Sequence, residues 1–321
     1  MSNEIKELMA LLDQNLAVKD PDGNVVLQVA LLATLYFEEP YRREAREAVV
    51  SCCEDYFQRC GRHLHWALNP DTELMQPFGK GKGSTPRSWL PMLDEDQSFS
   101  VIYHGAERER EASAFSMESF GAQRRPYRKH GYFRVSFPLL WFSENPGSLP
   151  EVVLDLCRKL KPVSGYGGIG VIESPDDAIS HRHEPLVYEL AQRFPGLEAD
   201  YPISHSNCLD KGIKGVNWLT VVGDRWLAPL GGADALEAGL AALDSRFVMH
   251  RFGSGVMIQS GPRPLLGDAV RNRWPELYIK LARYLKPIRV TEHWPFQHAG
   301  PGPRFEDPES SEAWLRRFDD R

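Results

Sequence analysis

The chain has 321 residues, of which 42% are hydrophobic, and a formal net charge of −6. A chain of this length and composition can bury a substantial core, which argues against a disordered protein and allows one large domain or two packed halves. The acidic balance disfavours broad affinity for nucleic acid, whose phosphates attract clustered lysine and arginine, and it leaves basic partners favoured by charge.

The five cysteines are odd in number and scattered through apolar stretches. Reduced thiols fit this pattern better than a disulfide framework, and they indicate a reducing compartment. The first residues mix charged and apolar side chains at helical spacing and lack the order of a signal peptide. No uncharged apolar run approaches the roughly 20 residues that span a bilayer. We therefore expect a cytoplasmic protein without a membrane partner.

The first part of the chain predicts a helix, a strand and a second helix. Apolar residues recur every three or four positions from Ile5 to Leu16, which indicates an amphipathic helix that ends before the turn signal at 20–23. The apolar run at 25–32 is typical of a strand buried on both faces. The spacing from Ala45 to Cys60 predicts the second helix, which Gly61 would end.

Residues 70–130 are rich in proline, glycine and charge, and we interpret most of them as an elaborated surface connection. One short strand is expected near 99–103. Alternation at 133–141 predicts a half-buried strand, in which Pro138 suggests an edge or a bulge. A helix at 152–160 follows.

The remaining patterns alternate short strands and helices without strict repetition. The expected strands are 216–222, 247–251 and 256–259, and the expected helices are 186–194, 233–243 and 274–285. Together these elements predict an α+β fold with a mixed or largely antiparallel β-sheet flanked by helices.

The domain organisation follows from the same patterns. Residues 1–290 are expected to form one globular domain, and residues 291–321 a Gly/Pro-rich acidic tail. The helix endings at 157–163 and 282–288 look alike, which leaves open two similar halves, 1–125 and 126–290.

A glycine-rich segment from Gly165 to Gly170 matches the dinucleotide pattern G-x-G-x-x-G. That pattern binds pyrophosphate only where a strand precedes it and a helix follows. Here a helix precedes the glycines and a strand continues after them. The segment therefore predicts close backbone packing in a strand and no nucleotide cofactor.

Four residues could supply metal ligands, namely His181, His183, His205 and Cys208. Their spacing matches no standard zinc pattern, and a polar loop entering a helix with Pro185 in its first turn explains the histidines equally well. We expect no metal, no cofactor and no catalytic residue. A metal-dependent enzyme built on these four residues stays as the alternative.

Two further enzyme classes lack their motifs. Residues 252–256 place Phe and Val where the G-x-S-x-G elbow of an α/β-hydrolase needs glycine. Restriction-type nucleases need an acid-x-Lys motif after a Pro-Asp pair, and the only acid-x-Lys motif, at 4–6, precedes every Pro-Asp pair in the sequence, including those at 21–22 and 175–176. The sequence therefore favours a protein that binds a partner over an enzyme.

Acidic clusters offer a surface for a basic partner. We nominate Asp94, Glu95, Asp96, Glu107 and Glu109 as binding residues, because charge complementarity steers association. Trp89, Phe99 and Trp314 lie near acidic clusters in the sequence and would be suitable aromatic anchors.

Residues 212–220 (GIKGVNWLT) resemble a type VI secretion immunity family, formerly a family of unknown function. Supporting segments occur in the same order and cover most of residues 25–290. They are 160–168, 193–198, 255–261, 266–268 and 284–289.

The resemblance implies an immunity protein that binds a cognate type VI toxin, a restriction-endonuclease-type DNase, and neutralises it by stoichiometric occlusion. The nominated acids would then bind the nuclease domain of the toxin. An adaptor that contacts other effector-delivery components is a further alternative. Gly165, Gly167, Gly215 and Trp218 mark the family, and we expect them to be structural.

Overall fold

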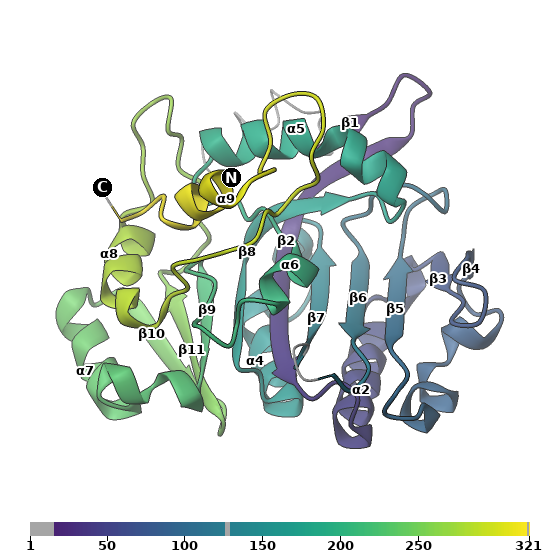
Figure 1. Ribbon diagram of the computed structural model, residues 1–321, viewed down its shortest axis with the longest axis horizontal. Coiled ribbons are helices and arrows are strands. Elements are labelled where there is room, and N and C mark those ends of the chain that lie inside the picture. Colours follow the sequence, from purple (N-terminus) through teal and green to yellow (C-terminus); the bar gives the residue numbers. More distant parts are fainter. Residues whose placement is uncertain (1–15, 126–128, 320) are drawn as a thin grey trace.

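The computed structural model describes residues 16–125, 129–319 and 321. Its described strands form one eleven-stranded sheet in the order β10-β11-β9-β8-β2-β7-β6-β5-β3-β4, with β1 paired to β2. All of these strand pairs are antiparallel. Helices cover both sides of the sheet (Figure 1). The predicted α+β fold with a largely antiparallel sheet is confirmed.

The strands are β1 (Ala17–Lys19), β2 (Val25–Glu38), β3 (Trp66–Leu68), β4 (Met75–Pro77), β5 (Phe99–His104), β6 (Ser116–Gly121), β7 (His130–Phe137), β8 (Ser164–Glu173), β9 (Leu219–Gly223), β10 (Phe247–Arg251) and β11 (Gly255–Ser260). The helices are α2 (Arg43–Cys60), α3 (Trp141–Glu144), α4 (Leu149–Leu160), α5 (Asp177–Arg193), α6 (Pro202–Ser206), α7 (Ala233–Leu243), α8 (Glu276–Tyr284) and α9 (Pro308–Leu315). No helix in the described ranges is long and apolar enough to span a bilayer.

Strand β2 is the centre of the sheet, since it pairs with β7 on one side and with β8 on the other. Nearly all of its residues are buried, which explains its continuous apolar run. Side chains alternate between the two sides of a strand. Leu31 and Leu35 therefore point to one side, and Thr34 and Tyr36 to the other.

Helices α2 and α4 cover the first side, which we call the apolar face (Figure 1). The ring of Tyr56 on α2 lies 5.4 Å from that of Phe137 on β7, and its hydroxyl donates to the carbonyl of Ser136 at 2.8 Å. Ser148 caps the start of helix α4, since its hydroxyl accepts from the backbone N–H of Glu151. It ends where Lys161 adopts a left-handed conformation before Pro162.

Helices α5, α6 and α9 cover the other side, which we call the polar face (Figure 1). Asp176 caps the start of helix α5, since its carboxylate accepts from the backbone N–H groups of Ala178 and Ile179. Residues 291–319, here called the C-terminal segment, lie over this face and bury Phe296, Phe305 and Trp314. The segment is thus a packed part of the fold.

Several predicted elements differ from the structure. Helix α5 begins at Asp177, well before the predicted start at residue 186, so Pro185 lies inside the helix and not in its first turn. The helix predicted from the spacing of Ile5 to Leu16 falls almost wholly on residues 1–15, which lie outside the described ranges, and residues 17–19 after it form β1. Strand β7 lies inside the sheet and ends before Pro138, so the edge predicted from this proline is wrong.

The sheet also bears on the expected domain organisation. Strands β5 and β6, both inside the sheet, belong to the stretch at 70–130 that we interpreted as mostly a surface connection. The division at 125/126 falls between β6 and β7, which are paired neighbours. One sheet therefore runs through both proposed halves, and an origin by duplication stays a prediction.

Candidate functional site

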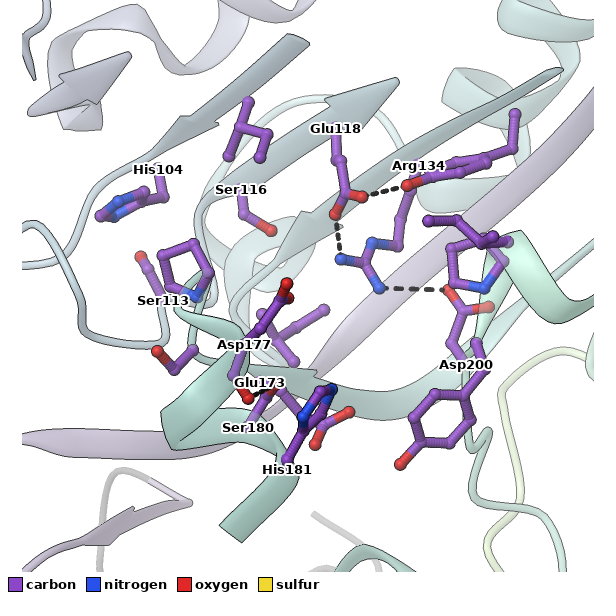
Figure 2. A pocket seen from close by; sticks show the side chains of 18 of the residues that line it. His104, Ser113, Ser116, Glu118, Arg134, Glu173, Asp177, Ser180, His181 and Asp200 are labelled. Atoms are coloured by element: carbon purple, nitrogen blue, oxygen red, sulfur yellow. Dashed lines mark hydrogen bonds and ion pairs between the residues drawn. The ribbon is translucent and has the colours of Figure 1, made fainter. Parts of the chain in front are cut away.

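A cavity of about 420 Å³ opens on the polar face. Strands β5 to β8 supply Ile102, Met117, Arg134 and Ile172 to its lining, and helices α5 and α6 supply its other wall. Figure 2 shows Asp177, Ser180 and His181 from α5 on the side of the cavity opposite Glu118 and Arg134. Concave sites with a few convergent polar groups are the usual places where proteins bind ligands or partner side chains.

Arg134 on β7 forms the charged floor of this cavity. Its guanidinium pairs with the carboxylate of Glu118 on β6 and lies 3.6 Å from that of Asp200 (Figure 2). Burial alone would lower the pKa of Arg134, but the two carboxylates raise it above its ordinary value. The floor therefore holds a fixed positive charge between two negative ones.

Asp200 is held by two strands of the sheet as well. The hydroxyl of Thr34 on β2 donates to its carboxylate at 2.6 Å, and the hydroxyl of Tyr166 on β8 donates to the other oxygen. Tyr166 also contacts the hydroxyl of Tyr36 at 2.8 Å. Because strands β2 and β8 hold this acid and β7 holds Arg134, the floor is rigid.

Glu173 at the end of β8 differs from these acids. Its Oε1 atom is buried and has no hydrogen-bond partner among the described residues. Burial raises the pKa of Glu173 to about 8, and the nearby Glu184 contributes to the shift. At neutral pH its carboxyl group is therefore mainly protonated and can donate a hydrogen bond into the cavity.

Glu184 lies at the rim, on α5, and binds the C-terminal segment. Its carboxylate accepts from Arg304 at 2.6 Å through one oxygen and from His298 at 3.0 Å through the other. The side-chain amide of Gln297 donates to its backbone carbonyl at 3.0 Å. The C-terminal segment is thus fixed against α5 by buried polar contacts.

The structure does not bring together the four residues of the alternative metal-dependent enzyme, namely His181, His183, His205 and Cys208. His181 lies at the rim of the cavity, while His183 on the same helix bonds the carbonyl of Ile179 at 2.8 Å. His205 lies on α6, where its Nδ1 contacts the Nε2 of His293 at 2.8 Å. Cys208, three residues later in the chain, is buried. Among the described residues, no three of these four have ligand atoms within metal-binding distance of one another.

The buried histidine pair is also unsuited to bind a proton. Burial lowers the pKa of His205 well below its usual range and that of His293 to about 4. Both rings are therefore neutral at physiological pH, and one donates to the other.

The five nominated acids are all exposed, but they form two separate groups. Asp94, Glu95 and Asp96 precede β5, whereas Glu107 and Glu109 follow it. The six residues of β5 separate the groups by about 20 Å, at roughly 3.3 Å per residue. The second group is next to the cavity, because the carbonyl of Glu109 bonds the lining residue His104 at 3.1 Å.

The aromatic anchors predicted beside the acidic clusters are wrong. Trp89, Phe99 and Trp314 are at most 5% exposed and belong to the core. Exposed apolar side chains lie elsewhere. Ile203 on α6 lines the cavity and is 50% exposed, and Trp294 in the C-terminal segment is 69% exposed.

The glycine-rich segment is structural, as predicted. A Cβ atom at Gly168 would lie 2.2 Å from the side-chain oxygen of Asn217, and one at Gly170 would lie 2.3 Å from Leu32. The neighbouring marker segment at 212–220 is structural too. Lys214 is buried against Glu198, and the indole of Trp218 donates to the carbonyl of Gly261 at 2.9 Å.

Sequence reasoning missed the residues that shape the cavity, namely Arg134, Glu173, Glu184, His298 and Arg304. In the sequence, Arg134 is one of the polar residues that alternate with apolar residues in a predicted half-buried strand. Such a pattern predicts an exposed side chain and does not indicate a buried charge. His298 and Arg304 fell in the presumed tail. The local signal near Glu184 was the proline that follows it. A proline inside a helix leaves the carbonyl four residues earlier without its usual hydrogen bond.

The chain is similar to one protein family and to a solved structure. A family model described as TsiV, type VI immunity for VRR-NUC, matches residues 48–318. A solved structure described as Pseudomonas aeruginosa T6SS protein PA0821 has a TM-score of 0.86 and 25% sequence identity, and the match covers 99% of this chain and 91% of that one. No curated protein matches. The resemblance found in the sequence is confirmed at the level of the family, while a closer likeness to one immunity protein, TsiT, stays a prediction.

Proposed function

Because the chain belongs to the type VI immunity family for VRR-NUC, we propose that it binds a VRR-NUC toxin and neutralises it by stoichiometric occlusion. The complex would block the active site of the toxin or occupy an adjacent surface, so that DNA cannot dock. The family match over residues 48–318 is the observation that carries this proposal. No catalytic turnover by the immunity protein is needed.

Electrostatics supports a direct contact with the DNA-binding surface of a nuclease. Such a surface must be positively charged to hold phosphates. The present chain carries a net charge of −6. Carboxylates outnumber cations around the polar-face cavity, because Arg134 pairs with Glu118 and Asp200 and Arg304 pairs with Glu184, while Glu111 and Asp177 add two further acids to the lining. The mainly protonated Glu173 does not add to this negative charge.

The rim of the cavity offers apolar contact area as well. Ile203 projects from α6 at the cavity, and Trp294 follows His293, whose ring contacts His205 on that helix. Exposed aromatic and aliphatic side chains beside a hollow are the residues that usually carry most of the energy of an interface. We therefore place the docking surface on the polar face, around α6.

We assign different roles to the two groups of nominated acids. Glu107 and Glu109 lie in the loop that contacts the cavity residue His104, so they fit the rim of the interface. Asp94, Glu95 and Asp96 lie at the far end of β5, and the side chain of Glu95 already pairs with Arg124 at 3.1 Å. They would contribute through long-range steering.

Buried thiols support a cytoplasmic location. All five cysteines are free and buried. Free thiols persist in a reducing compartment, and a nuclease that reaches the cytoplasm would meet its inhibitor there.

Co-expression with a VRR-NUC toxin tests the proposal. Cells should survive, and the two proteins should co-elute from size exclusion as a complex of fixed stoichiometry. Survival without a complex would contradict occlusion and favour an enzymatic antidote. A complex without survival would favour an adaptor that carries the toxin to the delivery machinery.

Charge reversal separates the two acidic groups. The double variant Glu107→Lys with Glu109→Lys should weaken toxin binding and its salt dependence, and Asp94→Lys with Asp96→Lys should slow association with a smaller loss of affinity. Equal, unchanged affinities in both variants would contradict a role for these acids.

A further inference from the structure

Three side chains at the rim of the polar-face cavity converge on one point. His181 and Glu184 lie three positions apart on α5, so they share one face of the helix. His298 reaches the same place from the C-terminal segment, and the centres of the His181 and His298 rings lie 3.7 Å apart. One ligand atom from each of the three residues lies within 4.8 Å of the other two.

A proline in α5 explains why these groups meet. Pro185 has no backbone N–H, so the carbonyl of His181, four residues earlier, loses its helical partner. The guanidinium of Arg304 lies 3.3 Å from that carbonyl oxygen and 2.6 Å from Oε2 of Glu184. Arg304 thereby holds the C-terminal segment, and with it His298, against this turn of the helix.

The same contacts turn one oxygen of Glu184 towards the imidazole rings. Oε2 is bound to Arg304, while Oε1 accepts from the backbone N–H of His298 at 3.3 Å and faces the Nδ1 atom of the same residue at 3.0 Å, a contact that a bound metal ion would replace. Glu184 is buried, so its carboxylate cannot turn away into solvent. An imidazole pair beside a fixed carboxylate oxygen is a common donor set for a borderline divalent metal ion.

We propose that His181, Glu184 and His298 bind a divalent transition metal ion of the zinc class. Ligands of a tetrahedral zinc ion lie about 3.4 Å from one another, given metal–ligand distances of about 2.1 Å. The side chain of His298 is 66% exposed and can rotate to close the remaining gap. Arg304 then acts as the outer partner that orients the carboxylate.

The site would be open towards the cavity, since all three residues are part of its lining. The protein supplies three ligands, which leaves a fourth position for water or for an anionic group in the cavity. Binding also joins α5 to the C-terminal segment, two parts of the chain that are far apart in sequence. This inference does not depend on the toxin.

Direct titration of the free protein tests the site. Untagged protein, stripped with a chelator and dialysed, is titrated with Zn²⁺ by calorimetry and with Co²⁺ by visible absorption. We expect one equivalent of Zn²⁺, an intensified Co²⁺ spectrum typical of low coordination number, and no comparable binding of Mg²⁺, which prefers oxygen ligands. His298→Ala and His181→Ala should each weaken Zn²⁺ binding at least about tenfold.

His183→Ala is the matched control, because His183 lies on the same helix two residues from His181 but outside the convergent set. Its Zn²⁺ affinity should equal that of the wild type. Far-ultraviolet circular dichroism confirms that each variant is folded, and His298→Ala is the decisive one because its side chain is largely exposed. Wild-type protein without a tight equivalent of Zn²⁺ would overturn the proposal, and so would unchanged binding in His298→Ala.

Discussion

On the apolar face, α2 and α4 pack aliphatic, aromatic and thiol side chains against the sheet, whereas on the polar face charged groups are buried between the sheet, α5 and the C-terminal segment. Cys53 and Leu156 are examples of the apolar packing. The pairs Lys214–Glu198 and Arg304–Glu184 are examples of the buried charged groups. Burial raises the pKa of the Cys53 thiol well above its usual range, so this thiol is unreactive.

The two faces differ in what their burial contributes. Apolar area removed from water stabilises the fold at about 25 cal/mol per Å². Buried charges cost desolvation energy that their mutual attraction offsets only when geometry and hydrogen bonds are good. Stability alone would not require the buried charges of the polar face. The apolar face therefore holds the sheet together, and the buried charges make the polar face the place to look for function.

The largest effect is expected from breaking a buried ion pair on the polar face. Lys214→Met should lower the free energy of unfolding by about 3–5 kcal/mol, because Glu198 is left buried without its cation. Burial lowers the pKa of Lys214, and Glu198 opposes that shift. Urea unfolding measures the loss. The double variant with Glu198→Gln should recover part of it, and a single variant as stable as the wild type would contradict this account.

On the apolar face, Leu156→Ala should cost about 2–5 kcal/mol, because it removes a buried side chain and leaves a cavity. Asp155→Ala, an exposed neighbour on the same helix, is the control and should change stability by less than about 0.5 kcal/mol. The same unfolding experiment reports both values. Equal losses in the two variants would show that α4 does not pack as described.

The pH dependence of stability isolates Glu173. Its pKa in the folded protein is about 8, above the ordinary 4.5, so between these values the folded state binds more protons than the unfolded chain. Its contribution is complete below pH 4.5 and is lost as the pH rises through 8, with a slope of at most about 1.4 kcal/mol per pH unit. Glu173→Gln should remove that slope. Identical pH profiles for wild type and variant would refute the shift.

The smallest effects are expected from the helix caps, one on each face. Asp176→Ala at the start of α5 and Ser148→Ala at the start of α4 should each cost about 1 kcal/mol. Asp176 accepts two backbone bonds, at 3.0 and 3.2 Å, and Ser148 accepts one at 3.4 Å. The loss should therefore be larger at Asp176. Thermal unfolding of both variants measures the two losses. A larger loss for Ser148→Ala than for Asp176→Ala would contradict this expectation.

The two faces also differ in how far the sequence predicts them. Strand β2 and helix α2 follow from periodicity, because a continuous apolar run and a spacing of three and four carry the information locally. The polar face depends on contacts between distant segments, such as that of Arg304 with Glu184. No local pattern encodes such a contact.

Local rules also misplaced single features of the polar face. Pro185 suggested the start of a helix, but it lies inside α5 because Arg304 binds the carbonyl that the proline leaves free. Trp314 was an expected anchor because it lies beside acids in the sequence, yet it packs over the buried Lys214 at 5.2 Å. Tertiary contacts decided both positions.

The affinity of a VRR-NUC toxin for two matched surface variants shows whether the toxin docks on the polar face. Ile203→Arg changes an exposed side chain at the polar-face cavity, and Val248→Arg changes one on the outermost strand β10. We expect Ile203→Arg to weaken binding at least about tenfold, or 1.4 kcal/mol, and Val248→Arg to bind like the wild type. Full affinity in Ile203→Arg, or a loss confined to Val248→Arg, would contradict docking on the polar face.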